Sequence, residues 1–252
     1  MRFEKIPPST KTVWTGRGRV DYLLKRSPRR RSLQITISER GQVEVAAPAR
    51  LRDKTINDFV IQKAAWIARQ IEWAGRRQSI LETKRYETGS LFLFLGKKYP
   101  LQVQTQPIRR ARIHFDGQGW SMVIPGSDRT GSPQRLIKNK LVSWYRQQAK
   151  EILGSRVLFF ARQMKLDLST ICIRSQKSIW GSCHTAKRAV HLNWQLVMMP
   201  MNVIDYVVVH ELSHLVHGNH SKRFWNKVAK TLPDFRQRQQ WIKKNQMDLI
   251  LP

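Results

Sequence analysis

The sequence predicts an α+β protein, with a β-rich N-terminal half followed by a mostly helical half that carries a small sheet. Short runs of alternating apolar residues fill residues 20–125, which is the pattern of half-buried strands. From residue 134 onward, apolar residues recur three and four positions apart, which is the spacing of helices packed on a core. A polar run rich in Gly and Pro, residues 125–133, separates the two patterns, and we expect the domain boundary there.

The first half is expected to contain a lead-in, a three-stranded sheet and one helix. Residues 1–19 hold adjacent prolines and scattered glycines, which predict a loose lead-in. Three alternating runs then predict one antiparallel sheet, with a hairpin turn at residues 39–42. The apolar positions of these runs are Val20, Tyr22, Leu24, Leu33, Ile35, Ile37, Val43 and Val45. A helix should follow, capped by Asp53 or Thr55 and apolar on one face through Trp73.

A second group of strands and then the helical part complete the expected order. These strands are expected at residues 90–95, 99–105, 112–115 and 120–124, with turns at Gly96–Lys97 and Asp116–Gly117. The helical pattern runs from Gln134 to Phe160, with a break near Gly154. The small sheet is expected from strands at residues 168–174 and 189–195, with a turn at residues 181–184.

The chain is strongly basic, with 46 Lys and Arg against 17 Asp and Glu and a formal net charge of +29. Its cations gather in clusters at residues 25–31, 76–77, 109–112 and 236–244. Such a surplus attracts polyanions, so we expect nonspecific affinity for nucleic acid or other polyanions. No sequence motif of a nucleic-acid-binding module accompanies the charge.

The sequence contains no run of 18 apolar residues and no apolar segment close to Met1, so we expect neither an integral membrane segment nor a signal peptide. Its two cysteines, Cys172 and Cys183, are too few and too far apart to suggest a disulfide framework. We therefore expect a cytoplasmic protein, of an oligomeric state that the sequence leaves open. For Cys183, a nucleophilic thiol is the alternative to a buried small apolar side chain.

The strongest chemical signal of the sequence is an H-E-x-x-H motif at residues 210–214, inside an apolar helical pattern for which Pro200 suits the start and Gly218 the end. Residues four apart share one face of a helix, so His210 and His214 can point at one metal ion. Glu211 then lies beside the metal without binding it, where a carboxylate can take a proton from water. Burying these polar groups without a partner is unfavourable, and a metal ion supplies that partner.

The third metal ligand is argued from the donors that remain downstream. After Glu211 the chain has no further Glu, so only histidines can complete the site well. His217 lies on the same helix, about 10 Å along the axis from His210, and three ligands in line cannot close around one small ion. His220 lies beyond Gly218, where the chain can turn back. We favour His220 as the ligand and keep His217 as the alternative.

The run HELSHLVHGNHSKRFW, residues 210–225, resembles the signature of the YgjP-like metallopeptidase domain family, whose relatives include the SprT-like and WLM zinc peptidases. A second likeness lies upstream, in KSIWGSC at residues 177–183 and HLNW at residues 191–194. Ile179 departs from it, because the family usually has a basic residue there. The likeness extends over residues 20–245.

The resemblance implies a zincin-like metallopeptidase domain over residues 134–252, with an active-site helix, one zinc ion and a polypeptide substrate. It places a group of substrate-binding residues near the metal: Trp180, Gly181, Ser182 and Asn193. The expected chemistry is hydrolysis of a peptide bond, with the metal on His210, His214 and His220 and with Glu211 as general base. Fe, Co and Mn are the alternatives to zinc.

Two questions stay open in the sequence. The first is a further oxyanion donor, for which Arg188 and Tyr206 are candidates. The second is a different function, in which a basic nucleic-acid- or ribosome-associated protein has a structural zinc site, or acts on proteins bound to nucleic acid.

Overall fold

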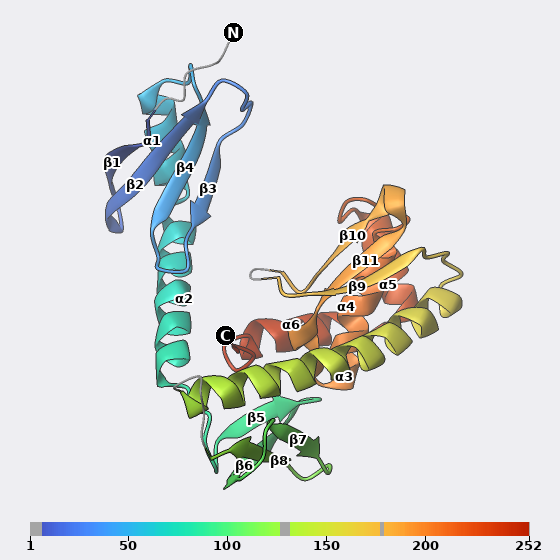
Figure 1. The fold of residues 1–252 in the computed structure, drawn as a ribbon. Helices are drawn as coiled ribbons and strands as arrows, with labels where there is room; N and C mark the ends of the chain where they lie inside the picture. The colour runs from blue at the N-terminus through green and yellow to red at the C-terminus, as the bar shows by residue number, and fades with distance from the viewer. Residues whose placement is uncertain (1–6, 127–131, 177–178, 252) are drawn as a thin grey trace. The chain divides into compact units, whose positions relative to one another are not determined.

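A computed structural model describes residues 7–126, 132–176 and 179–251 and has the expected α+β architecture (Figure 1). The chain forms two compact units, residues 1–84 and 85–251, and each is described by itself. We expected the boundary at residues 125–133, of which 127–131 lie outside the described residues. The division instead follows a long helix that ends at Thr83, because the strands that begin after it pack with the later helices. No helix in the described ranges is both long and apolar enough to cross a bilayer.

The first unit is a four-stranded sheet with two helices. Its elements are β1 (Ser9–Thr15), β2 (Gly18–Ser27), β3 (Gln34–Ile37), β4 (Val43–Pro48), α1 (Asp53–Gln62) and α2 (Ala64–Thr83). The strand order is β1-β2-β4-β3, and β2 pairs with β4 in parallel while the other neighbours are antiparallel. The expectation of one antiparallel sheet is therefore wrong. The reason is that the chain crosses over to β3 before the hairpin brings β4 back beside β2.

Two further expectations for this unit need correction. Most of the described lead-in is strand β1, because Gly16–Arg17 makes a two-residue turn that pairs Thr15 with Gly18. The expected single helix is two helices that meet at Lys63, and Arg52 rather than Asp53 or Thr55 takes the cap position. The core lies between the helices and one face of the sheet. Its buried residues are Val13, Tyr22, Leu24, Val43, Val45, Ala47, Ile56, Val60 and Ile67.

The second unit combines a four-stranded sheet, a three-stranded sheet and four helices. Its strands are β5 (Leu91–Phe94), β6 (Lys97–Gln106), β7 (Arg112–Phe115), β8 (Trp120–Pro125), β9 (Thr170–Arg174), β10 (Gly181–His184) and β11 (Ala189–Asn193). Its helices are α3 (Pro133–Gln163), α4 (Met201–Ser213), α5 (Lys222–Thr231) and α6 (Phe235–Asn245), with 3₁₀ turns η1 (Thr185–Lys187) and η2 (Trp194–Met198). The sheet orders are β5-β6-β8-β7 and β10-β11-β9.

The long helix α3 is the common support of this unit (Figure 1). It runs unbroken for 31 residues, so the expected break at Gly154 is wrong. Toward the four-stranded sheet, its Tyr145 hydroxyl donates to the carbonyl of Leu93 at 2.6 Å. Toward α4, its Arg156 donates Nε and Nη2 to the two carboxylate oxygens of Asp205, at 2.6 and 2.9 Å. The helix α3 therefore holds both the four-stranded sheet β5-β6-β8-β7 and the helix α4, which carries the H-E-x-x-H motif.

The β5–β6 hairpin also contacts the segment that precedes α4. The backbone N–H groups of Leu95 and Gly96 donate to the carbonyls of Val197 and Met198, at 2.8 and 3.1 Å. Gly96 has a φ of +81°, and a Cβ there would lie 2.6 Å from Pro200 Cγ. The turn residues are thus Leu95–Gly96, one position before the expected pair, and only glycine fits against Pro200.

Candidate metal centre

The helix α4 presents the first two imidazoles. Its sequence is apolar on nearly all sides, and it begins directly after Pro200 with ten of its thirteen residues buried. His210 lies within its last turn and His214 takes its C-cap position. The helix ends at Ser213, five residues before the expected stop at Gly218, because the backbone tightens there. The next three N–H groups, of residues 214–216, donate to carbonyls three residues back at 3.1–3.2 Å.

The short loop after α4 reverses the chain and returns a third imidazole. His220 stands at its end, and Ser221 is the N-cap residue of α5, although its side chain makes no capping hydrogen bond. The backbone carbonyl of His217 lies 3.1 Å from His214 Nδ1. That contact assigns the ring proton of His214 to Nδ1 and leaves Nε2 free to bind a metal.

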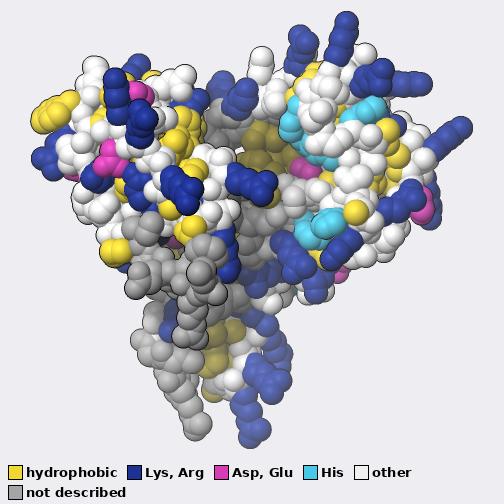
Figure 2. All heavy atoms as spheres, turned by 90° about the horizontal axis from the view of Figure 1, so that it is seen from above, with side chains coloured by type: hydrophobic (Ala, Val, Ile, Leu, Met, Phe, Trp, Pro, Cys, Tyr) yellow, Lys and Arg dark blue, Asp and Glu magenta, His cyan; other side chains and the backbone are white. Residues whose placement is uncertain are grey.

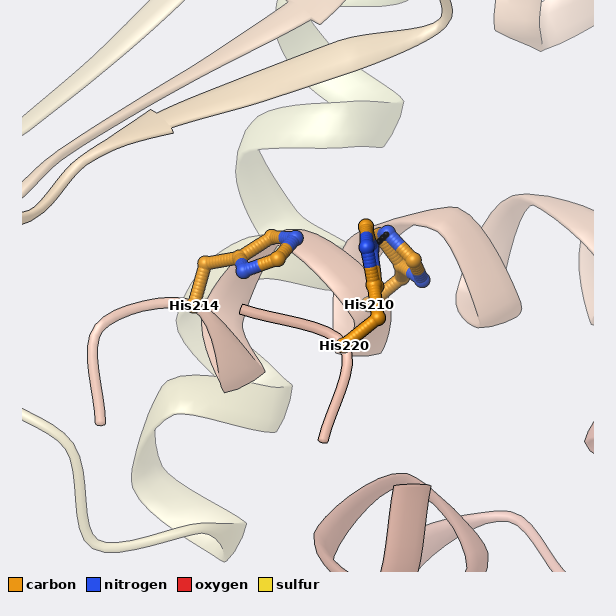
Figure 3. A group of neighbouring side chains, drawn as sticks. All are labelled: His210, His214 and His220. Atoms are coloured by element: carbon orange, nitrogen blue, oxygen red, sulfur yellow. Dashed lines mark hydrogen bonds between the residues drawn. The ribbon is translucent and has the colours of Figure 1, made fainter. Parts of the chain in front are cut away.

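The three imidazoles of His210, His214 and His220 point toward one another (Figure 3). One ligand atom from each lies within 4.8 Å of the others, and the Nε2 atoms of His210 and His220 are 3.1 Å apart. Two nitrogens bound to one tetrahedral zinc at about 2.0–2.1 Å would be about 3.3 Å apart, so the spacing suits zinc. The side chain of His217 lies outside this group, and His217 contacts the group only through its backbone carbonyl.

The ring of Phe224 packs against all three imidazole rings. It is completely buried, and its ring centroid lies 5.0 Å from that of His210, 4.6 Å from His214 and 4.8 Å from His220. Trp225 stacks on His220 with a centroid distance of 5.6 Å. Sequence reasoning gave these aromatics no function. The available signal was their place on the apolar face of a strongly amphipathic α5, four and five residues after His220.

Burial favours the neutral form of His210 and His214, which is the form that binds metal. Burial and, to a smaller extent, the neighbouring rings of His214 and His220 together lower the pKa of His210 to about 4. Burial also lowers the pKa of His214, against the opposing effect of its contact with the His217 carbonyl. The Nδ1 atom of His210 is buried with no hydrogen-bond partner among the described residues. These observations fit a ring held ready for a ligand at Nε2.

Glu211 stands beside this group and is buried, with 6% of its surface exposed. Burial raises the pKa of its carboxyl to about 7. The side chain packs on the start of β10: a Cβ on Gly181 would lie 2.6 Å from Glu211 Cγ and 2.8 Å from its Oε1. Only a glycine at residue 181 leaves the carboxylate its room.

The residues expected to bind substrate, 180–182, lie at the start of β10, where Gly181 packs against Glu211. Residues 181–184, expected as a turn, form strand β10 because they pair with β11 in antiparallel register, with Gly181 opposite Leu192. β10 is an edge strand of the small sheet. Trp180 and Ser182 are half-buried, and Ser182 Oγ accepts from Gln176 Nε2 at 3.3 Å. Lys177 and Ser178 of the upstream motif lie outside the described residues.

Asn193 has a different environment from the other residues expected to bind substrate. It is 2% exposed, and its Nδ2 donates to the carbonyls of Gln176 and Ile179, at 2.8 and 3.4 Å. Its Oδ1 accepts from the N–H of Gln195 at 3.0 Å. These contacts hold the segment before Trp180 against the end of β11, so the geometry suits positioning rather than direct contact with a substrate.

Of the remaining candidates, Tyr206 lies against the metal group, with its ring centroid 5.9 Å from that of His210, and the others belong to the small sheet or its turn. Burial and the nearby Glu211 together raise the pKa of the Cys183 thiol to about 11, which disfavours a nucleophilic thiolate. Burial and Glu211 likewise raise the pKa of Tyr206 to about 12. Arg188 has its Nη1 3.2 Å from Asp167 Oδ2 and so forms an exposed ion pair. His184 and His191 belong to the small sheet and do not join the three-histidine group.

Comparisons with known proteins place the chain. Among solved structures, the metallopeptidase zymogen abylysin of Pyrococcus abyssi is 22% identical and covers 42% of this chain and 95% of its own, with a TM-score of 0.30. Wss1 from Saccharomyces cerevisiae is 19% identical and covers 37% of this chain and 75% of its own, with a TM-score of 0.27. No curated protein matches significantly. The sequence model of the YgjP-like metallopeptidase domain matches residues 31–245, and the chain therefore belongs to the YgjP-like metallopeptidase family.

Proposed function

We propose that this protein is a zinc-dependent peptidase in which His210, His214 and His220 hold one zinc ion and Glu211 is the general base. The observation that carries the proposal is the convergence of three imidazoles, together with a buried carboxyl whose pKa is about 7 on Glu211, the residue after His210. Zinc bound there would supply a Lewis acid that polarises a peptide carbonyl and acidifies a water molecule.

The donor set favours a catalytic site over a structural one. Structural zinc sites have four protein ligands, whereas catalytic sites have three and keep a position open. Within the described ranges, no fourth His, Cys or carboxylate joins the three histidines. A structural site also has no need of a buried carboxyl next to a ligand. Burying Glu211 costs stability, and carboxyls buried at such a cost are typical of functional sites.

Glu211 then carries the proton through the reaction. A carboxyl with a pKa of about 7 can both accept and release a proton near neutral pH. It takes a proton from the attacking water as the new carbon–oxygen bond forms. It gives that proton to the leaving nitrogen as the carbon–nitrogen bond breaks, which yields a carboxylic acid and an amine.

The edge strand β10 is the proposed guide for an extended polypeptide. An edge strand has backbone N–H and C=O groups that can pair with one more strand. Gly181 sets this strand directly against Glu211, so a peptide paired with β10 would pass the carboxyl. In this arrangement Trp180, Gly181 and Ser182 contact the substrate, and Asn193 positions them through its bonds to the carbonyls of residues 176 and 179.

Two single variants and one matched control test the proposal. Glu211→Gln should keep zinc but lower cleavage of a peptide library by about 10²–10⁴-fold, which is the usual contribution of a general base. His220→Ala should lose zinc in metal analysis. His217→Ala is the control, because its side chain lies outside the ligand group and its carbonyl remains.

Two outcomes would contradict the proposal. Cleavage by Glu211→Gln at the wild-type rate would remove Glu211 as the base. Loss of zinc from His217→Ala, with retention by His220→Ala, would show that the third ligand is assigned wrongly.

A further inference from the structure

One face of the first unit's sheet is free of the unit's own helices. Residues alternate across β1 and β2, and the buried ones, such as Val13, Tyr22 and Leu24, pack with α1 and α2. The alternate residues point the other way. This outward face carries Thr10, Thr12 and Trp14 of β1, Arg19, Asp21, Leu23 and Lys25 of β2, Glu44 and Ala46 of β4, and Gln34 and Thr36 of β3.

Trp14 is the largest apolar side chain on this face and is 74% exposed. It lies opposite Arg19 in the β1–β2 pair, next to the turn that holds Arg17. A large ring held in the open on a rigid strand contributes little to its own core. It offers a flat surface on which a planar ligand can stack.

The first unit carries more cations than anions, although the charges of the face itself balance, with Arg19 and Lys25 against Asp21 and Glu44. Over residues 7–84 the chain has 17 Lys and Arg against 7 Asp and Glu, and Lys and Arg side chains stand out over the molecular surface in Figure 2. The two carboxylates of the face are already paired, Asp21 with Arg19 at 2.9 Å and Glu44 with Lys25 at 2.6 Å.

The cations continue past the end of β2 into an arginine loop, residues 29–31. Arg29 and Arg31 are exposed. Arg30 reaches back to the sheet, where its Nη1 donates to Gln34 Oε1 at 3.0 Å. The exposed cations outside the face's own ion pairs therefore lie at its two ends: Arg17 in the turn beside Trp14, and Arg29 and Arg31 beyond the end of β2.

We propose that this outward face binds single-stranded nucleic acid, with Trp14 stacking on a base and the arginine loop contacting phosphates. Stacking platforms combined with basic grooves are how proteins hold single strands without reading their sequence. The bases of a duplex are already stacked on one another, so an exposed ring favours the unpaired form.

The dimensions of the face agree with this ligand. From Arg19 to Ser27, β2 spans about 26 Å at about 3.3 Å per residue. That length suits the lower end of single-strand sites, about 4–16 nucleotides for one small domain. The proposal concerns the first unit and stands independently of the proposed peptidase activity.

The test measures binding of the full chain to fluorescein-labelled 20-mers of oligouridylate and oligothymidylate, and to a duplex of equal length. Fluorescence anisotropy gives the affinity at several salt concentrations. We expect Trp14→Ala to weaken single-strand binding by about tenfold or more, whereas Trp14→Phe, which keeps an aromatic ring, stays within about threefold of wild type. Neither change touches the core, and thermal unfolding checks that both variants fold.

A matched pair of triple variants separates this site from general charge. Changing Arg29, Arg30 and Arg31 to Ala should reduce the slope of log affinity against log salt by about 2, since each single-strand phosphate contact contributes about 0.7. The control changes Arg109, Arg110 and Arg112 to Ala, three exposed arginines of the second unit. It removes equal charge and should leave the slope nearly unchanged.

Several results would overturn the proposal. They are equal losses from both triple variants, equal affinities of Trp14→Ala and wild type, and a preference for the duplex. Self-association that Trp14→Ala abolishes, seen by sedimentation velocity, would identify the face as an interface between copies of this chain.

Discussion

Gly181 and Glu211 are in such close contact that no side chain fits between them. A Cβ on residue 181 would fall 2.6 Å from Glu211 Cγ and 2.9 Å from Cδ. The edge strand β10 and the helix α4 therefore approach one another at the carboxyl itself. The position of the proposed base depends on this glycine.

We expect Gly181→Ala to displace the Glu211 side chain and lower peptidase activity by tenfold or more, with zinc still bound. The added methyl overlaps the side chain, and overpacking of this kind destabilises proteins by about 1–3 kcal/mol. Zinc content and the cleavage rate, measured on the same samples, check it. His184→Ala is the control, since His184 is an exposed residue of the same strand and lies outside the three-histidine group. Wild-type activity in Gly181→Ala would show that the carboxyl does not need its present position.

Phe224 should control metal affinity although it binds no metal. Its ring contacts all three imidazoles, with centroid distances of 4.6–5.0 Å. Phe224→Ala leaves a cavity beneath them and is expected to destabilise the fold by about 3–5 kcal/mol. The rings then lose their common support, so zinc affinity should fall by tenfold or more in competition with a chelator. Phe224→Leu fills most of the space and should retain affinity within a few-fold. Equal affinities in the two variants would contradict a supporting role.

The grouping of the three histidines could be predicted from the sequence because its information is local. His210 and His214 are four residues apart on one helix, and His220 follows after a short reversal. Phe224 was not predicted to support the rings, since that contact appears only when the loop folds back. The contact of Gly181 with Glu211 depends on pairing β10 with β11, which no local pattern specifies.

The same reasoning explains the errors in the fold. Gly16 and Gly18 suggested a loose segment, but they belong to the tight turn of a hairpin. The segment before this turn is strand β1, because it pairs with β2. The polar run at residues 125–133 suggested a domain boundary from composition alone. Composition cannot reveal that Tyr145 on the helix after this run bonds to Leu93 before it, which joins both sides in one unit.

The metal-free protein should lose stability with rising pH because of Glu211. Its carboxyl has a pKa of about 7 in the folded chain, against an ordinary value of 4.5 for a glutamate in the unfolded chain. Between these values the folded chain keeps a proton that the unfolded chain releases. The stabilising contribution is therefore complete below pH 4.5 and is lost as the pH rises to 7, a change of about 3 kcal/mol.

Comparison with Glu211→Gln isolates this effect. His210 acts in the opposite direction, because burial lowers its pKa from 6.5 to about 4, so its contribution rises over the same range. It is present in both proteins and cancels in their difference. Chemical unfolding with a chelator present, from pH 5 to 8, should show wild type losing free energy of unfolding relative to the variant. Parallel curves would mean that the carboxyl is not held in an apolar environment.

The ion pair between Arg156 and Asp205 should stabilise the attachment of α4 to α3. Its side chains are 27% and 12% exposed, and its two short bonds use both carboxylate oxygens. Asp205→Ala leaves the guanidinium partly buried without its partner, for which we expect a loss of about 2–4 kcal/mol in the free energy of unfolding. Arg156 also lies over the rings of Phe159 and Phe160, at 4.8 and 5.1 Å, so its removal loses packing as well.

The double variant Arg156→Ala with Asp205→Ala separates these effects. If the pair itself stabilises the contact, the double variant should lose less than the sum of the single variants, by about 1 kcal/mol or more. Additive losses in urea unfolding would show that the two side chains act independently.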